Sequence, residues 1–237
     1  MNIILVEKKD FVNESNAVRI AGRRFTHIKE VLSAKVGDLL KCGELGGKMG
    51  TGEIIYIDKS HVELKVSLTE DPPRALPVNV VVALPRPKVI KRLLQNITTL
   101  GVKKIFLINA NLVEKSYWQS PALSESEIKK QLILGLEQAR DTILPEVTLC
   151  RSFKIFVEDK LPGIIKGKKA ILAHPGSTDP CPILKNKPTT IAIGPEGGFI
   201  TYEIEKLISI GFTEISLGKR ILKTETALIA LLSKFES

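Results

Sequence analysis

Residues 78–101 read VNVVVALPRPKVIKRLLQNITTLG. Apart from Asn79, the run at 78–84 is apolar, which is typical of a strand covered on both faces of a sheet. From 88 to 100 the apolar side chains recur at helical spacing, and Gly101 ends the pattern as a C-terminal stop. This stretch therefore predicts a buried parallel strand followed by an amphipathic helix.

The same alternation continues to the end of the chain. Strands are expected at 104–109, 146–150, 169–173, 189–193 and 214–217, and helices at 124–140, 202–209 and 225–235. Alternating strands and helices predict an α/β fold with a parallel sheet. Such sheets bind ligands at the carboxyl ends of their strands, where the loops 173–177, 194–198 and 218–226 would lie. We expect these three loops to form one pocket.

The first 70 residues have a different pattern. Short strands are expected at 3–6, 39–42, 52–57 and 61–68, with one helix between them that begins at Thr26 as its N-cap. Several short strands and one helix predict a small barrel. The Pro-rich segment 71–77 is a stiff connector. We therefore expect a barrel domain at 1–71, a linker at 72–77 and the α/β domain at 78–237.

Charge is distributed unevenly along the chain. The net charge is +9, and residues 1–72 are neutral, so the excess lies in residues 73–237. The segment 72–113 has no acidic residue but seven lysines and arginines. An unbalanced basic stretch is expected where a protein meets a polyanion such as nucleic acid, although general solubility would give the same composition.

Targeting and metal signals are absent from the sequence. No apolar run approaches the roughly 20 residues needed to span a bilayer, and the start of the chain lacks the basic region of a secretion signal. The three cysteines are far apart, with no Cys-x-x-Cys pair, so neither a metal site nor a disulfide framework is expected. Sparse thiols suit a reducing compartment, and we expect a cytoplasmic protein with no membrane or metal partner.

Two of the three loops carry distinctive chemistry. The glycines of GPEGG at 194–198 allow the backbone to approach a ligand closely, and the motif matches neither dinucleotide nor triphosphate fingerprints. In the last loop Lys219, Arg220 and Lys223 precede a helix N-terminus, where cations oppose the helix dipole. This placement suggests that they hold an anion, unless Glu225 merely neutralises them. Thr224 is either the N-cap or a ligand contact.

Candidate nucleic-acid contacts lie in both halves. One polar helix face carries lysines and arginines without interleaved acids, and a basic pair precedes the first helix; a solvated face is the alternative for each. Tyr117 and Trp118 either stack on a base or fix their loop to the core. The predicted RNA-binding residues are Arg23, Arg24, Arg86, Lys88, Lys91 and Arg92.

Two motifs carry a resemblance. IGPEGGF at 193–199 and LGKRILKTETA at 217–227 resemble the ribosomal RNA small subunit methyltransferase E family, within the SPOUT class. FTHIKEVL at 25–32, VGD at 36–38, LGV at 100–102 and EQA at 137–139 extend the similarity along the chain. The chain departs from the family pattern at Thr99, Arg140 and Lys223.

The resemblance implies a PUA-like RNA-binding barrel, a C-terminal domain with a deep trefoil knot, and a homodimer. It implies that S-adenosylmethionine is the cofactor and that the product is N3-methyluridine in 16S ribosomal RNA, within the small subunit. The residues assigned to the cofactor are Leu172, Ala173, His174, Pro175, Ile193, Gly194, Pro195, Glu196, Gly197, Gly198, Leu217, Gly218, Ile221, Leu222, Thr224, Thr226 and Ala227.

The predicted catalytic residues are Arg220, Lys223 and Glu225. The N3 of uridine is protonated at neutral pH, and a positioned cation would favour the deprotonated base, with Arg220 the first candidate and Lys223 the second. Glu225 and Glu196 are candidates for the general base. Methylation of transfer RNA or of a ribose hydroxyl, and a non-catalytic RNA-binding assembly factor, are the alternatives.

Overall fold

The computed structural model describes residues 1–12, 16–185 and 187–235. The chain forms two units, Met1–Arg74 with Ile133–Leu144, and Ala75–Leu132 with Pro145–Ser237. The domains predicted from the sequence are contiguous, and the segment Ile133–Leu144 departs from that division. It groups with the first unit because Leu136 shares a buried apolar cluster with Ile3 and Leu5.

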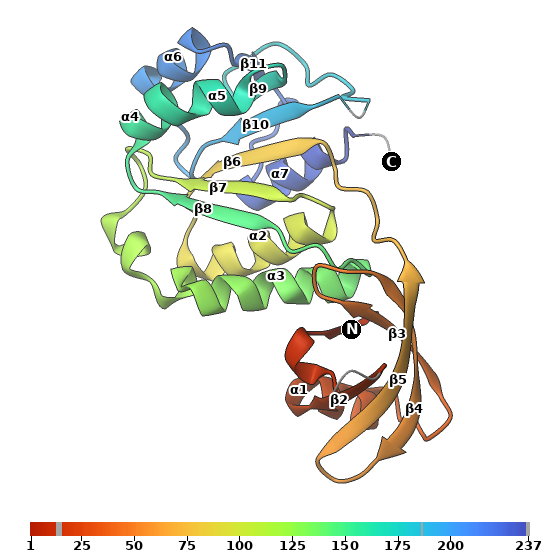
Figure 1. Cartoon of the computed structure of the whole chain (residues 1–237). Helices are drawn as coiled ribbons and strands as arrows, with labels where there is room; N and C mark the ends of the chain where they lie inside the picture. Colours follow the sequence, from red (N-terminus) through yellow and green to blue (C-terminus); the bar gives the residue numbers. More distant parts are fainter. Residues whose placement is uncertain (13–15, 186, 236–237) are drawn as a thin grey trace. The chain divides into compact units, whose positions relative to one another are not determined.

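A six-stranded parallel sheet forms the centre of the second unit (Figure 1). Its strands, in spatial order, are β11 (Thr213–Ile215), β9 (Lys169–Ala173), β10 (Thr189–Ile193), β6 (Val78–Ala83), β7 (Lys104–Ile108) and β8 (Glu146–Cys150). Every residue of β6 and β10 is buried, the polar Asn79, Thr189 and Thr190 included, as expected for strands covered on both faces. The predicted parallel α/β sheet is confirmed.

Helices flank this sheet. They are α2 (Pro87–Thr99), α3 (Glu125–Ala139), α4 (Phe153–Ile155), α5 (Leu161–Ile165), α6 (Thr201–Ser209) and α7 (Thr224–Leu232). α2 begins at a proline, which suits a first helical turn, and buries Ile90, Leu93, Leu94 and Ile97. α2 and α7 pack against each other, while α5 packs on β10 (Figure 1). None of the described helices is long and apolar enough to cross a membrane.

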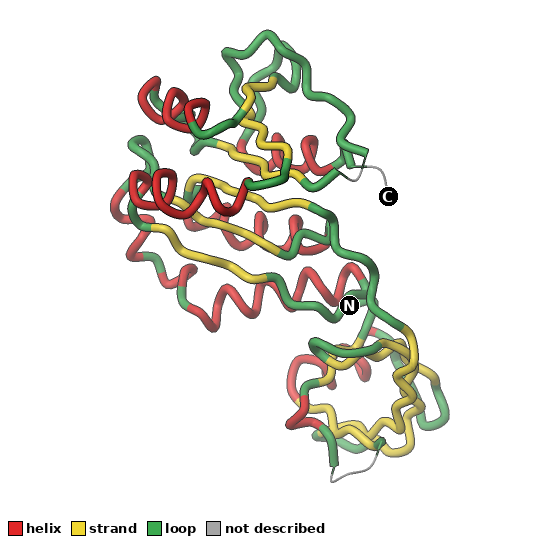
Figure 2. Tube along the Cα trace, turned by 45° about the horizontal axis from the view of Figure 1, so that its top comes forward, coloured by secondary structure: helices red, strands yellow, loops and turns green. Residues whose placement is uncertain are grey.

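The first unit contains a five-stranded sheet in the order β1 (Ile4–Val6), β3 (Leu39–Glu44), β4 (Met49–Ile57), β5 (His61–Glu70) and β2 (Ala17–Ala21). Its strands curl around a common apolar core, which Figure 2 shows end-on. The sequence analysis missed β2. It was also wrong about Thr26, which ends α1 (Gly22–Thr26) and continues into a π-helical turn at His27–Val31, so its hydroxyl caps nothing.

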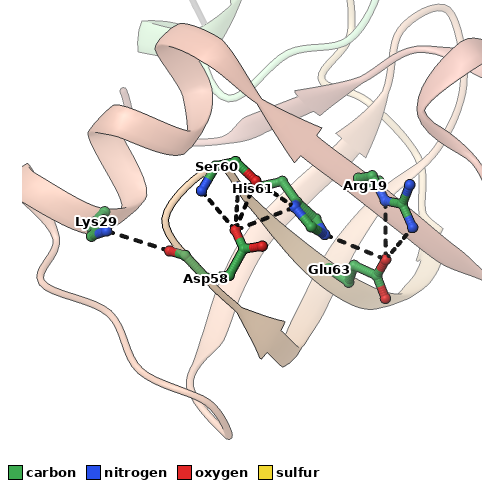
Figure 3. A network of polar contacts seen from close by, with 6 residues as sticks. All are labelled: Arg19, Lys29, Asp58, Ser60, His61 and Glu63. Carbon is green, nitrogen blue, oxygen red and sulfur yellow. Dashed lines mark hydrogen bonds and ion pairs between the residues drawn. The ribbon is translucent and has the colours of Figure 1, made fainter.

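A polar network closes the turn between β4 and β5 (Figure 3). The Asp58 carboxylate accepts hydrogen bonds from the backbone N–H groups of Ser60 and His61, at 2.6 and 2.9 Å, and these bonds lower the pKa of Asp58 to about 2. His61 Nε2 lies 3.7 Å from Glu63, which also pairs with Arg19. An Asp side chain that accepts hydrogen bonds from backbone N–H groups two and three residues later is common in turns, and here it holds the turn in its conformation.

Arg24 has a structural role in this unit. Its guanidinium donates to both carboxylate oxygens of Asp10, at 2.6 and 2.9 Å, and to the Leu5 carbonyl at 2.7 Å. Burial raises the pKa of Asp10, but hydrogen bonds from Arg24 and from the Glu7 N–H outweigh burial, so the pKa lies below its ordinary value. These donors are therefore committed within the protein, which argues against the predicted RNA contact for Arg24.

Replacing Arg24 with methionine is expected to lower the free energy of unfolding by about 3 kcal/mol, because the Asp10 carboxylate would stay buried without its partner. Since the folded pKa of Asp10 is depressed, the pair stabilises fully above the unfolded pKa, near 4, and its contribution is lost as pH falls through the folded value. Urea denaturation at several pH values measures both effects.

The matched control is Arg19→Met, which breaks the exposed pair between Arg19 and Glu63 at 2.8 Å. Exposed pairs contribute at most about 1 kcal/mol, so this variant should unfold close to the wild type. Equal stability of the Arg24 and Arg19 variants would contradict the structural role of Arg24.

Candidate functional site

The three marked loops come together because their strands are neighbours in the sheet. β11, β9 and β10 are adjacent and parallel, so the chain leaves all three at the same edge. There the loops enclose a cavity of about 260 Å³. Its lining is Ala173, His174, Pro175, Ile193, Gly194, Pro195, Glu196, Gly198, Phe199, Ile215, Leu217, Gly218, Arg220, Ile221, Leu222, Lys223, Thr224 and Ala227.

Most residues assigned to the cofactor lie in this lining, and three do not. Leu172 is buried within β9. Gly197 faces Leu112, because a Cβ at Gly197 would come within 3.0 Å of that side chain. Thr226 lies on an exposed position of α7. Phe199 and Ile215 line the cavity and were missed, because both look like ordinary core residues in the sequence.

The glycine loop is built by close backbone approach. A Cβ at Gly194 would lie 2.9 Å from the Phe199 nitrogen and 3.0 Å from the Gly198 carbonyl carbon, which are backbone atoms that cannot move aside cheaply. Gly198 has φ +79, a conformation that favours glycine. The buried Thr224 hydroxyl donates to the Gly194 carbonyl at 3.2 Å and so ties the loop to α7. Lys223, not Thr224, occupies the N-cap position.

Two residues of the last loop that line the cavity, Ile221 and Leu222, have backbone donors that are unpaired in the described part of the chain. Within the described ranges, the N–H groups of Ile221 and Leu222 donate no hydrogen bond. Unpaired backbone donors beside an apolar lining are typical of a site that recognises a small polar ligand.

A buried carboxylate at this edge contacts both the loop after β7 and the segment that follows the loop 194–198. Glu203 in α6 is 3% exposed, and its two oxygens accept from the backbone N–H of Asn111 at 2.7 Å and of Ile200 at 3.1 Å. Asn111 precedes Leu112, the side chain that Gly197 faces. Glu203 therefore holds the loop after β7 against the glycine loop.

Replacing Glu203 with glutamine should lower the free energy of unfolding by about 1.5–3 kcal/mol, because an amide can accept through only one of its two terminal atoms. The loop displaced by this loss borders the glycine loop, so affinity for a ligand of the cavity should also fall. Chemical denaturation and calorimetric titration measure the two effects. Glu205→Gln, at an exposed position of the same helix, is the control and should stay within about 0.5 kcal/mol of wild type. If both variants had the same stability and the same ligand affinity, Glu203 would not hold the loop after β7 in place.

The three predicted catalytic residues separate in the structure. Arg220 and Lys223 line the cavity and are exposed, and neither has an ion-pair partner among the described residues. Glu225 lies outside the lining and pairs with Arg92 at 3.0 Å, so the geometry does not support it as the general base. Glu196 lies in the lining and accepts from the Arg86 backbone N–H at 3.3 Å.

The basic face of α2 is compensated by acids that come from distant parts of the sequence. Lys91 pairs with Glu127 at 2.9 Å, and Arg92 pairs with Glu225. Lys88 and Arg86 are exposed. In the first unit, Arg23 donates to both oxygens of Glu137, at 2.9 and 2.7 Å. The local absence of acids in the sequence thus does not persist in space, and it is weaker support for RNA contact than the composition suggested.

The aromatic pair after β7 divides its roles. Trp118 is buried, its indole N–H donates to Asn109 at 2.8 Å, and the Arg151 guanidinium lies over its ring. Trp118 therefore fixes the loop to the core. Tyr117 is half-buried and donates to Glu114 at 2.7 Å, and that hydrogen bond raises the pKa of the Tyr117 hydroxyl.

The chain matches known proteins along most of its length. Residues 72–236 match the family described as the RNA methyltransferase domain. The chain is 31% identical over 239 residues to the ribosomal RNA small subunit methyltransferase E of Treponema pallidum. The alignment covers 97% of this chain and 88% of that protein. It is 28% identical to ribosomal RNA small subunit methyltransferase E 1 of Borreliella burgdorferi, over 97% of this chain and 95% of that protein.

Solved structures share the fold. A Legionella pneumophila methyltransferase solved with its cofactor S-adenosylmethionine has a TM-score of 0.76 at 23% identity, over 98% of this chain and 96% of that one. The ribosomal RNA small subunit methyltransferase E of Neisseria gonorrhoeae, bound to S-adenosylmethionine, has a TM-score of 0.74 at 19% identity, over 98% and 95% of the two chains. The family match and the Treponema relative confirm the resemblance of the two motifs: the chain belongs to the RNA methyltransferase family that includes the ribosomal RNA small subunit methyltransferase E proteins.

Proposed function

We propose that this protein uses S-adenosylmethionine to methylate N3 of a uridine in 16S ribosomal RNA. The observation that carries the proposal is the cavity at the carboxyl ends of β11, β9 and β10, which combines an apolar lining, glycine backbone and two exposed cations. The relatives named for small-subunit ribosomal RNA support the substrate class.

The cavity suits the cofactor in size and chemistry. Ile193, Ile215 and Leu217 offer apolar contacts for an adenine ring, and the free N–H groups of Ile221 and Leu222 can donate to its polar edge. A Cβ at Gly198 would meet nothing within 4 Å, so a ligand can approach the backbone there, while Gly194 lets the loop fold closely on itself. The neighbours solved with S-adenosylmethionine share this fold. When bound, the cofactor supplies an electrophilic methyl group, and no metal is needed for its transfer.

Arg220 and Lys223 supply the cations that the acceptor requires. Once N3 loses its proton, negative charge spreads over the base and must be held, and a fixed cation lowers the free energy of that charge. Both side chains lie in the lining without a carboxylate partner among the described residues, so their charge is available to a ligand. Glu196 is the carboxylate in the lining that can take the proton.

Further parts of the proposal follow from family membership. We place a PUA-like RNA-binding barrel in the first unit, which the curled five-stranded sheet supports, and a trefoil knot in the second. The protein would act as a homodimer in the cytoplasm, on an assembled small subunit. Residues 1–71, 72–77 and 78–237 remain the proposed barrel, linker and methyltransferase domain, with Ile133–Leu144 packing into the first unit.

The reaction is tested by comparing modified nucleosides between a deletion strain and the same strain complemented with the gene. Loss of one N3-methyluridine from 16S ribosomal RNA is the expected result. Loss of a methyl group from transfer RNA, or from a ribose hydroxyl, would show that one of these is the position methylated. Unchanged nucleosides, together with no calorimetric binding of S-adenosylmethionine, would instead identify a non-catalytic assembly factor.

A further inference from the structure

Six lysines gather at the edge of the parallel sheet opposite the cavity, and we call this group the lysine edge. It consists of Lys166, Lys168, Lys169, Lys185, Lys187 and Lys234. Lys169 is the first residue of β9 and lies beside Thr189, the first residue of β10. The Lys169 N–H donates to the Pro188 carbonyl at 2.9 Å, directly after Lys187. The amino ends of both strands, which lie at the end away from their arrowheads in Figure 1, therefore carry these side chains.

Backbone contacts and electrostatics bring Lys234 to the same place. The Leu184 N–H donates to the Lys234 carbonyl at 2.9 Å, so the end of the chain lies beside the segment that holds Lys185. Burial raises the pKa of the Cys181 thiol, while Lys234 and Lys169 both act to lower it. One thiol thus feels the ammonium groups of both lysines.

No carboxylate in the described part of the chain compensates the lysine edge. Among the residues that the structure describes, none of the six lysines has a carboxylate within ion-pair distance, and Lys166, Lys169, Lys185 and Lys187 are exposed. Other cations of the same unit are paired, as Lys91 is with Glu127 and Lys206 is with Glu158 at 3.1 Å. Unpaired like charges repel one another, so a cluster of them makes physical sense where a polyanion neutralises it.

We infer that the lysine edge binds the phosphate backbone of RNA, an inference that rests on the proposed RNA substrate. Lysines on flexible stems at an open edge suit a row of phosphates, whereas planar, bidentate recognition of one small anion would call for arginine. Strands of five residues separate this edge from the cavity by roughly 17 Å. An RNA that reaches both must therefore extend several nucleotides beyond the base in the cavity, and a single nucleotide bound there would not touch the lysines.

The test reverses three exposed lysines, in the variant Lys166→Glu, Lys169→Glu and Lys187→Glu. Its control, Lys129→Glu, Lys130→Glu and Lys154→Glu, changes the net charge equally at exposed positions elsewhere. Affinity for transcribed 16S ribosomal RNA is measured from about 50 to 200 mM salt. The slope of log affinity against log salt should shrink by ~0.7–0.9 per lost phosphate contact, hence by about 2–3 in the first variant. The control should keep the wild-type slope, and calorimetry should give all three proteins equal affinity for S-adenosylmethionine.

A wild-type slope in the first variant, with cofactor affinity intact, overturns the inference. So does an equal loss in both variants, which would mean that only net charge matters. Binding of the wild type to phosphatidylserine vesicles that only the first variant loses, with an unchanged RNA slope, would assign the lysine edge to membranes and overturn the inference as well. If the wild type binds RNA but transfers no methyl group to it, the proposed function fails, while the comparison of slopes still decides the lysine edge.

Discussion

Arg220→Ala is expected to slow methyl transfer by ~100–1000-fold while affinity for S-adenosylmethionine stays close to wild type. Arg220 lies in the cavity lining, exposed and without an ion-pair partner among the described residues. It also lies four residues before α7 begins, where a cation is electrostatically disfavoured by the helix dipole. That cost is offset if the guanidinium meets negative charge on the deprotonated base during the reaction.

Two further results separate this role from simple packing. Arg220→Lys should recover only part of the rate, because lysine keeps the charge but lacks the planar fork. Higher pH should partly restore the methylation rate of Arg220→Ala, because a larger fraction of the uridine is then deprotonated at N3 without help from the arginine. Single-turnover rates with saturating cofactor measure both effects. A wild-type rate in Arg220→Ala, or loss of cofactor binding in that variant, would remove Arg220 from the chemical step.

Gly194→Ala should weaken binding of S-adenosylmethionine by about 10–100-fold, the equivalent of roughly 1–3 kcal/mol of overpacking. The added methyl group would meet the backbone of Gly198 and Phe199 at 2.9–3.2 Å, so the loop itself must move out of its present form. Gly197 is a poorer site for this test, because its Cβ would face Leu112 and not the cavity.

The matched control for Gly194→Ala is Gly163→Ala in α5, where an added Cβ would meet nothing within 4 Å. Isothermal titration and thermal denaturation of both variants separate loss of the ligand from loss of the fold. If Gly194→Ala is folded and binds the cofactor as Gly163→Ala does, the glycine loop is not part of the binding site.

Much of the second unit could be predicted because its signals are local. The strands at 146–150, 169–173 and 189–193 coincide with β8, β9 and β10, since short runs rich in apolar and β-branched residues favour strands. The helices at 153–165 were missed, because Pro162 and Gly163 interrupt a short apolar pattern. β2 was missed because its alternating exposure rests on only five residues.

The location of the site could be predicted from the sequence, but most of its side-chain contacts could not. Strand ends and glycines are visible in the sequence, and they indicate the right loops. Side-chain pairing is not visible, because it depends on partners far away in the chain: Glu225 is committed to Arg92, 133 residues earlier, and Arg24 to Asp10. Glu203 shows the same limit, since a carboxylate in a first helical turn looks like ordinary capping until its second partner, Asn111, is known.

Reconstitution of the reaction with purified components shows whether the protein methylates N3 of a uridine in 16S ribosomal RNA. Purified protein is incubated with small ribosomal subunits from the deletion strain and S-adenosylmethionine labelled in its methyl group, and the ribosomal RNA is digested to nucleosides. We expect the label to elute with N3-methyluridine and to map to one position of 16S ribosomal RNA, and we expect Gly194→Ala and Arg220→Ala to reduce it greatly. Label in any other nucleoside, or no transfer by a protein that binds the cofactor, would contradict it.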